Sequence, residues 1–182
     1  LIKWIMERYN FIKNAKLYKV CADDDFRPIM CNVFFDSGKA IASNGHTLIV
    51  APINQISNLE DDMIEKLNGK LLTGKSYKKL LEYDFISDID DEGITCTKGF
   101  DTVKFLFYKG GGKYPDYNSV FPTKMGSVPY IGLRGNSLCK LCEAAGKKYA
   151  KIEFSDIIGA AKVSFRDCDI KGLIMPALVD NF

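Results

Sequence analysis

The sequence has no apolar stretch as long as the roughly 18 to 20 residues that a membrane-spanning helix requires. It contains one histidine among 182 residues, which excludes a metal centre built from several imidazoles. Its formal net charge is only +2, too small by itself to demand a polyanionic partner. Charges interrupt the first residues, LIKWIMERYN, where a signal peptide would be apolar, so we expect a cytoplasmic protein.

The six cysteines are scattered and do not suggest a disulfide framework. Cys31 and Cys139 each follow an apolar residue, and free thiols in such surroundings behave as small hydrophobic groups. Cys139 and Cys142 have the C-x-x-C spacing of a redox or zinc motif, but there is no second pair and His46 is the only histidine. We therefore expect reduced cysteines and no bound cofactor.

The charged residues are segregated along the chain. Acidic residues are bunched at 23–25, 60–62 and 88–92, whereas lysines gather elsewhere. Placement of charge matters more for partner choice than its sum, so this segregation is a first indication of function.

Three segments have helical patterns. Residues 137–145 repeat apolar side chains at helical spacing, with Asn136 as a possible cap and Gly146 placed to end the helix. Residues 75–83 follow Thr73, another possible cap, and leave lysines for solvent.

The third helical segment is 11–22, in which Phe11, Ala15, Tyr18 and Ala22 share one face. Short alternating or β-branched runs follow each helix, and we expect strands at 29–35, 40–43, 47–51, 93–97, 102–108, 151–154, 160–165 and 172–175. The helix starts recur about every sixty residues, which indicates three copies of one helix-plus-strands unit. Antiparallel pairing of such short strands predicts an α+β fold with the helices on one face of the sheets.

Three motifs resemble those of bacterial DNA polymerase III β-subunit sliding clamps. The residues RP at 27–28, followed by a strand and SNGHTL at 43–48, are similar to the family's arginine–proline step, strand and T-D-G-H-R-L turn. The residues YPDY at 114–117, with VFP at 120–122, resemble its F-P-D-Y segment and V-[IL]-P ending. The residues IMP at 174–176 resemble its terminal V-M-P-M.

The resemblance covers nearly the whole chain. It implies the DNA clamp fold, with residues 1–125 as a complete middle domain of two units and 126–182 as the second half of the last domain. The family's first domain and one half-domain would be absent. A clamp has no catalytic activity of its own, so the resemblance implies a binding protein and no enzyme.

In this family the three motifs meet at a hydrophobic groove that captures short peptides of polymerases, clamp loaders and repair proteins. Carried over residue by residue, the groove would be lined by Gly45, His46, Thr47, Leu48, Pro122, Met175, Pro176, Ala177 and Leu178. Asn44 and Thr47 depart from the family pattern, in which an acidic and often a basic residue stand at these positions.

The family's helices line a central channel and present basic side chains to the backbone of duplex DNA, which allows binding without sequence readout. The matching candidates here are Lys13, Lys16, Lys75, Lys78, Lys79 and Lys140. Lysines occupy any solvated helix face, so only their recurrence on all three helices favours the functional interpretation.

A competing motif lies at 69–76, which satisfies the P-loop pattern G-x-x-x-x-G-K-[ST]. A P-loop follows a buried strand, whereas the preceding residues 60–68 are acidic and typical of a helix or loop. Leu71 and Leu72 would also lie inside the phosphate loop. We therefore expect a strand at 70–73 entering a helix, and keep a nucleotide-binding enzyme as the least favoured alternative.

The favoured function is a clamp-like processivity factor that surrounds or contacts DNA and recruits partners through the groove. In the bacterial clamps that this chain resembles, two chains close a ring of twelve such units. A chain of three units would therefore need four copies, that is, a homo-oligomer, to close a similar ring. The main alternative is a clamp-fold module that binds peptides without encircling DNA.

Overall fold

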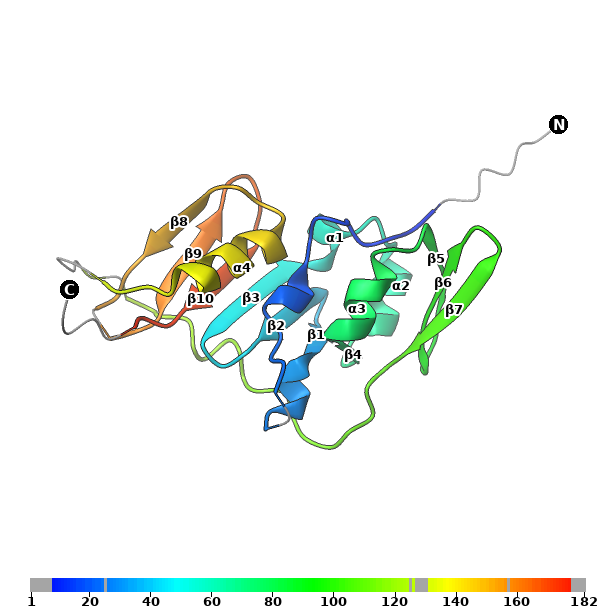
Figure 1. Cartoon of the computed structure of the whole chain (residues 1–182), viewed down its shortest axis with the longest axis horizontal. Helices are drawn as coiled ribbons and strands as arrows, with labels where there is room; N and C mark the ends of the chain where they lie inside the picture. Colours follow the sequence, from blue (N-terminus) through cyan, green and yellow to red (C-terminus); the bar gives the residue numbers. More distant parts are fainter. Residues whose placement is uncertain (1–7, 25, 125, 127–130, 157, 178–182) are drawn as a thin grey trace.

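The computed structural model describes residues 8–24, 26–124, 126, 131–156 and 158–177. Within these ranges the chain forms two antiparallel sheets and several short helices, which confirms the α+β fold class (Figure 1). No helix there is long and apolar enough to cross a membrane.

The elements repeat one order, in which a helix is followed by three consecutive strands. The strands are β1 (Asn32–Asp36), β2 (Lys39–Ser43), β3 (Thr47–Pro52), β4 (Leu71–Thr73), β5 (Phe85–Ile89), β6 (Gly93–Lys98), β7 (Asp101–Leu106), β8 (Ala150–Glu153), β9 (Ala161–Phe165) and β10 (Lys171–Ile174). The helices are the 3-10 turns η1 (Leu17–Lys19) and η2 (Pro28–Cys31) and the α-helices α1 (Ile53–Ile56), α2 (Asp61–Leu67), α3 (Gly74–Leu80) and α4 (Gly135–Ala145). Three units follow: η1 with β1–β3, α3 with β5–β7, and α4 with β8–β10.

One sheet contains strands from both sides of the domain boundary expected at 125/126. Its seven strands run in the order β4-β1-β2-β3-β10-β9-β8, and the smaller sheet runs β5-β6-β7. The third strand of the first unit pairs with the third strand of the last unit, with Thr47 opposite Ile174 and Val50 opposite Lys171. The division at 125/126 therefore stays a prediction, because the two parts share continuous backbone hydrogen bonding.

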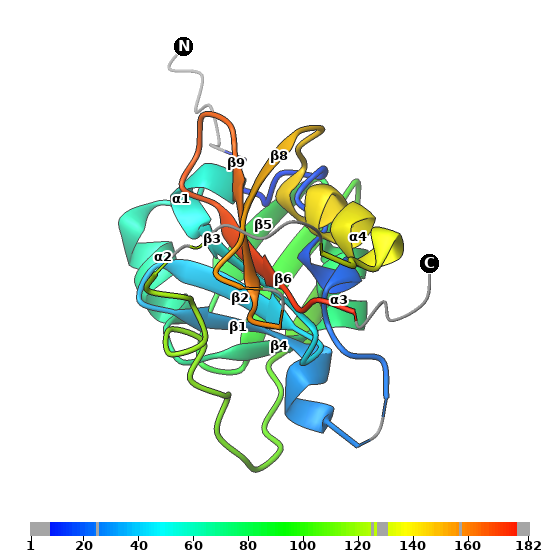
Figure 2. The same ribbon diagram turned by 90° about the vertical axis from the view of Figure 1, so that its left-hand side faces the viewer.

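The three unit helices lie side by side on one face of the large sheet. Figure 1 shows the short blue helix η1 between α4 and α3, and Figure 2 shows all three on the same side. Two hydrogen bonds fix the middle member: Tyr77 of α3 donates its hydroxyl to the Ala15 oxygen at 3.2 Å, and the Lys16 amide donates to the Glu143 oxygen of α4 at 3.2 Å.

The helix expected at 11–22 is wrong, since only Leu17–Lys19 is helical. Phe11 instead forms an antiparallel bridge with Ser57, and Lys16 has a ψ angle of 58° that breaks the helical path. The apolar spacing was produced by an irregular segment that buries its side chains between two neighbouring helices. Tertiary packing here overrides the local pattern.

The other two helices are confirmed, with differences at their ends. The Thr73 hydroxyl caps α3 by accepting a 3.1 Å hydrogen bond from the Ser76 amide, as expected, but α3 ends at Leu80 and not at residue 83. Helix α4 ends at Gly146, whose φ of 65° is left-handed. Asn136 does not cap α4, because the helix already begins at Gly135.

Strand positions follow the sequence with two differences. Strand β1 starts at Asn32 and not at 29, because Pro28–Cys31 forms the turn η2. Strand β5 was not expected; a bulge between Ile86 and Asp88 shifts its register and interrupts the alternation by which a strand is recognised. The expected strand and helix at 70–76 are confirmed by β4 and α3.

The central strands β2 and β3 of the large sheet are buried on both faces, which explains why their residues are nearly all apolar. Ala40, Ala42 and Ile49 face the main core beneath the helices. Ile41 and Leu173 face the opposite side and belong to a smaller apolar cluster, completed by the segment 107–124. Figure 2 shows this yellow-green segment on the side away from α4 and α3, where it positions the groove described next.

Candidate functional site

A groove with a cavity of about 370 Å³ lies at the junction of β3 and β10. Its floor is formed by Leu48 and Leu173, which are register partners in the two strands. The backbone amide of Met175 donates a 2.9 Å hydrogen bond to the His46 oxygen and extends this junction past the strand ends. The groove therefore lies between two units that are far apart in the sequence.

The turn at one end of the groove is held by its own polar groups. The Asn44 side-chain oxygen accepts hydrogen bonds from the amides of His46 (3.0 Å) and Thr47 (2.9 Å). Arg27 Nη1 donates to the Asn44 backbone oxygen at 2.5 Å. Gly45 has a φ of 84°, and a Cβ there would lie 2.7 Å from Arg27 Nη1. The family pattern has an acidic residue at position 44. Because the Asn44 amide oxygen accepts the same hydrogen bonds as a carboxylate would, the turn is preserved.

The YPDY segment forms the opposite wall. The Tyr114 ring stacks on Phe34 with centroids 4.9 Å apart, and the Tyr117 hydroxyl donates a 2.7 Å hydrogen bond to Asp36. Burial, reinforced by the neighbouring Asp36 carboxylate, raises the pKa of Tyr117 to about 12. Both tyrosines are therefore neutral wall residues with their rings packed on strand β1.

The groove is lined mainly by apolar and aromatic side chains. Leu48, Leu173 and the two tyrosines line it, and Met175 is 41% exposed at the rim. The Thr47 side chain faces the other side of the sheet, since its register partner Ile174 belongs to the main core, and its buried hydroxyl makes no hydrogen bond with any described residue. Such a cavity suits an apolar ligand.

Five of the expected groove residues meet here: Gly45, His46, Thr47, Leu48 and Met175. Pro122, Pro176 and Ala177 do not line the cavity, and Leu178 lies outside the described residues.

Ala177 instead pairs with Gly132 and donates a 2.9 Å hydrogen bond to its oxygen. The groove residues inferred from the family resemblance did not include Tyr114 and Tyr117, although both belong to the YPDY motif. Binding of a peptide by any of these residues stays a prediction.

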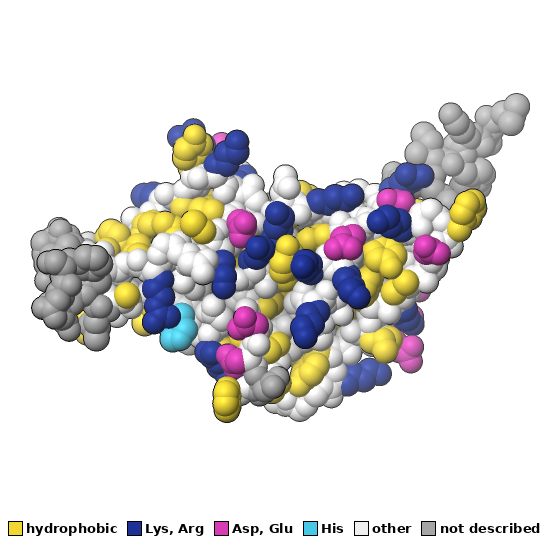
Figure 3. Space-filling view, viewed as in Figure 1, with side chains coloured by type: hydrophobic (Ala, Val, Ile, Leu, Met, Phe, Trp, Pro, Cys, Tyr) yellow, Lys and Arg dark blue, Asp and Glu magenta, His cyan; other side chains and the backbone are white. Residues whose placement is uncertain are grey.

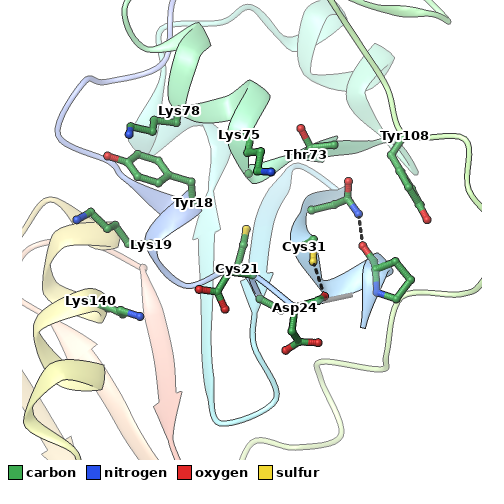
Figure 4. Close-up of a pocket in the computed structure, with 15 residues that line it drawn as sticks. Tyr18, Lys19, Cys21, Asp24, Cys31, Thr73, Lys75, Lys78, Tyr108 and Lys140 are labelled. Carbon is green, nitrogen blue, oxygen red and sulfur yellow. Dashed lines mark hydrogen bonds between the residues drawn. The ribbon is translucent and has the colours of Figure 1, made fainter. Parts of the chain in front are cut away.

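A second cavity, of about 550 Å³, lies on the helix-bearing face between η1, η2, α3 and α4 (Figure 4). Lys75, Lys78 and Lys140 line it, together with Lys19, which the lysine pattern had not included. The other expected DNA-facing lysines, Lys13, Lys16 and Lys79, do not line this cavity. Figure 3 shows lysine and arginine side chains spread across this face, with acidic side chains among them.

The lysines of the cavity differ in their pairing. Lys19 lies 3.5 Å from Glu143, and the Lys78 ammonium lies 5.9 Å from the centre of the Tyr18 ring. Lys75 and Lys140 form no ion pair with any described residue.

Two acidic residues, Asp23 and Asp24, also line the cavity. Asp24 is paired with Arg27 at 2.6 Å, and this hydrogen bond holds the pKa of its carboxyl below the usual range.

Cys21, which lines this cavity, is not poised for nucleophilic chemistry. Burial and the nearby Cys31 raise the pKa of its thiol to about 12. A nucleophilic cysteine requires the thiolate, so Cys21 does not have the properties of a catalytic group at neutral pH.

The P-loop pattern at 69–76 does not form a phosphate-binding loop. Its middle residues make up β4, which pairs with β1 through Leu72 and Val33, and the helix after it has seven residues. The backbone amides that would cradle a phosphate are therefore placed in a sheet and a short helix.

No family model and no curated protein matches the chain. Its structure is nevertheless similar to those of bacterial sliding clamps. A C. crescentus β sliding clamp, described with PEG bound to a putative β-motif tethering region, matches 98% of this chain and 68% of its own length at a TM-score of 0.66 and 12% identity. The DNA polymerase sliding clamp from Bacillus subtilis matches 98% of this chain and 67% of its own length at a TM-score of 0.65 and 10% identity.

A DNA polymerase III subunit β clamp from Bartonella birtlesii, bound to griselimycin, matches 98% of this chain and 68% of its own length at a TM-score of 0.64 and 14% identity. At such low identity the likeness concerns the fold and not the activity. The chain, with its helix-plus-three-strand units and its helices on one face, has the DNA sliding clamp fold.

Proposed function

We propose that this protein is a sliding-clamp-like processivity factor that contacts duplex DNA with its helix-bearing face and recruits polymerase or repair proteins through the groove between β3 and β10. The carrying observation is the groove, whose apolar floor and half-exposed Met175 rim are suited to a short peptide with large apolar side chains. The protein supplies binding and no chemistry.

The groove is tested with a fluorescently labelled short peptide that contains Leu and Phe. Met175→Ala removes a flexible apolar side chain at the rim, so we expect an affinity about ten-fold lower, equivalent to about 1.4 kcal/mol. Ile12→Ala is the matched control, because Ile12 is comparably exposed but does not line the groove. Equal affinities of wild type and Met175→Ala would place the peptide site elsewhere. Leu178→Ala tests the one expected groove residue that lies outside the described part of the chain.

The DNA-facing role rests on lysines contributed by different units to one face. Lys75 and Lys140 belong to α3 and α4, which flank η1, so their charges can act on one stretch of phosphate backbone. Binding by charge alone is independent of sequence and weakens steeply with salt. Lys75→Ala/Lys140→Ala should reduce the affinity for duplex DNA and lower the slope of log affinity against log salt, whereas Lys66→Ala on α2 should not.

Encirclement of DNA would require further chains, because one chain supplies only three units. Among the described residues, one edge of β7 and one edge of β8 have no partner strand. A homo-oligomer would cover such edges. Light scattering measures the mass, and retention on circular but not linearised DNA tests for a closed ring.

A second candidate is a peptide-binding module that does not surround DNA, which is favoured by a groove formed entirely within one chain. A persistent monomer that binds peptide but is not retained on circular DNA would support this candidate and reject the ring.

A further inference from the structure

The two sheets have four outer strand edges, and the chain covers two of them with its own backbone. The Tyr108 amide donates a 2.7 Å hydrogen bond to the Leu71 oxygen of β4, and the Ile86 amide of β5 donates a 2.7 Å bond to the Tyr9 oxygen. Among the described residues, the outer edges of β7 and β8 have no partner strand. Figure 1 shows β7 and β8 at opposite ends of the molecule, so these edges do not pair with each other within one chain.

The free edge of β7 presents backbone groups to solvent. Five of its six residues are exposed. The Phe107 amide, just past the strand, donates a 2.8 Å hydrogen bond to the Glu92 oxygen across the hairpin. Because amides alternate in direction along a strand, those of Thr102, Lys104 and Leu106 point to the open edge. An edge of this kind is a template for a further strand.

The two free edges carry opposite charge. Residues 85–106, which form the small sheet, contain five acidic and two basic residues, whereas 147–165, which form β8, β9 and their approaches, contain four basic and two acidic residues. On β7, Lys104 lies between two carboxylates, 2.6 Å from Asp90 and 3.3 Å from Glu92. The β7 edge is therefore negative in sum, although its strand carries a lysine.

The β8 edge has the reverse arrangement. Its one carboxylate, Glu153, pairs with Lys151 at 2.9 Å and lies opposite Lys162 in the register of β9. Tyr149, directly before the strand, is an exposed aromatic residue, as Leu106 at the end of β7 is an exposed aliphatic one. Each edge thus combines open backbone groups and an exposed apolar side chain with a charge that complements the other edge.

We propose that the β7 edge of one copy of this chain pairs with the β8 edge of a second copy, so that the small sheet of one copy continues into the large sheet of the next. The two surfaces differ, so the contact is head to tail, and like charges disfavour β7–β7 and β8–β8 pairing. The inference rests on the homo-oligomer of the proposed function and names the contact that would form it.

Charge reversal tests the choice of partner. Sedimentation of the protein alone, at low salt and over a range of concentrations, should show assembly that weakens as salt is raised. Glu92→Lys/Asp101→Lys on the β7 side and Lys148→Glu/Lys151→Glu on the β8 side should each weaken assembly at least about ten-fold. An equimolar mixture of the two variants should regain assembly, because the reversed charges match again. Glu65→Lys/Glu82→Lys, outside the small sheet, is the matched control.

An edge proline tests the strand pairing itself. Thr102→Pro removes an amide that points away from β6, so the bonds within the small sheet remain while the edge is blocked. We expect this variant to stay monomeric and Thr102→Val, which keeps the amide, to assemble. Circular dichroism verifies the folding of every variant.

Three results would overturn the proposal: a wild-type protein that is monomeric at every concentration in low salt, reversal variants that assemble as well as the control, or a mixture that does not regain assembly. Neither DNA nor peptide is present in these measurements. Assembly through the two edges without retention on circular DNA would reject the processivity role and keep this interface.

Discussion

Arg27 and Asn44, 17 positions apart, are joined by a 2.5 Å hydrogen bond from the guanidinium to the backbone oxygen. The bond ties the arginine–proline step to the turn that ends the groove. Arg27→Ala should lower the free energy of unfolding by about 1 to 2 kcal/mol and weaken peptide binding, because the turn loses its external support. Urea unfolding monitors the first effect. Arg166→Ala, at an exposed turn, is the control, and an equal loss in both variants would contradict this role.

Gly45 is expected to be far less replaceable than Gly38. Both have left-handed φ angles, 84° and 73°, so alanine strains the backbone at either position. Only at Gly45 would the new Cβ also meet Arg27, whereas nothing lies within 4 Å at Gly38. Thermal unfolding should show a larger loss of stability for Gly45→Ala than for Gly38→Ala. The difference between the two losses measures the clash with Arg27. Equal losses would mean that Arg27 moves aside freely.

Thr47→Val should keep or raise stability without changing peptide binding. The buried Thr47 hydroxyl has no partner in the described structure, so its removal should leave the free energy of unfolding unchanged or raise it by about 1 kcal/mol. The Thr47 side chain shares a sheet face with Ile174 of the main core and not with the groove floor, so the peptide affinity should stay the same. Chemical denaturation and fluorescence anisotropy give the two values. A several-fold lower peptide affinity would mean that the hydroxyl contacts the bound peptide.

Tyr117 should make stability sensitive to alkaline pH. Its pKa rises from an ordinary value of 10.0 to about 12 in the folded protein, through burial and the Asp36 carboxylate. Because folding favours the protonated form, this contribution is fully present below pH 10 and is lost as the pH rises through about 12. The free energy of unfolding should fall less steeply over this range in Tyr117→Phe. Identical slopes in the two proteins would show that other groups cause the alkaline loss.

Local signals predicted part of this structure well. The left-handed ending at Gly146 and the Thr73 cap depend on a few neighbouring residues, and both are present. The segment around Leu17 could not be predicted in this way, since its burial between α3 and α4 depends on residues far along the chain. The same limit explains the missed strand β5, in which a bulge hides the alternation.

The candidate sites, too, could be predicted only in part from the sequence. The turn at Gly45 could be located from the motif, because its hydrogen bonds are local. The wall role of Tyr114 required knowledge that the segment 107–124 crosses the far face of the large sheet. Likewise, no sequence pattern shows that Lys75 and Lys140, from two different helices, line one cavity.

The pairing of β3 with β10 also constrains how quickly a partner could leave. Since Leu48 and Leu173 belong to one hydrogen-bonded sheet, the groove floor cannot widen unless backbone bonds break. The wall around Tyr114 and Tyr117 is joined to the sheet by side-chain contacts, among them a ring stack and one hydroxyl bond. Residence time of a bound peptide would then be governed by these two tyrosines, and exchange of partners could proceed without any relative movement of the units.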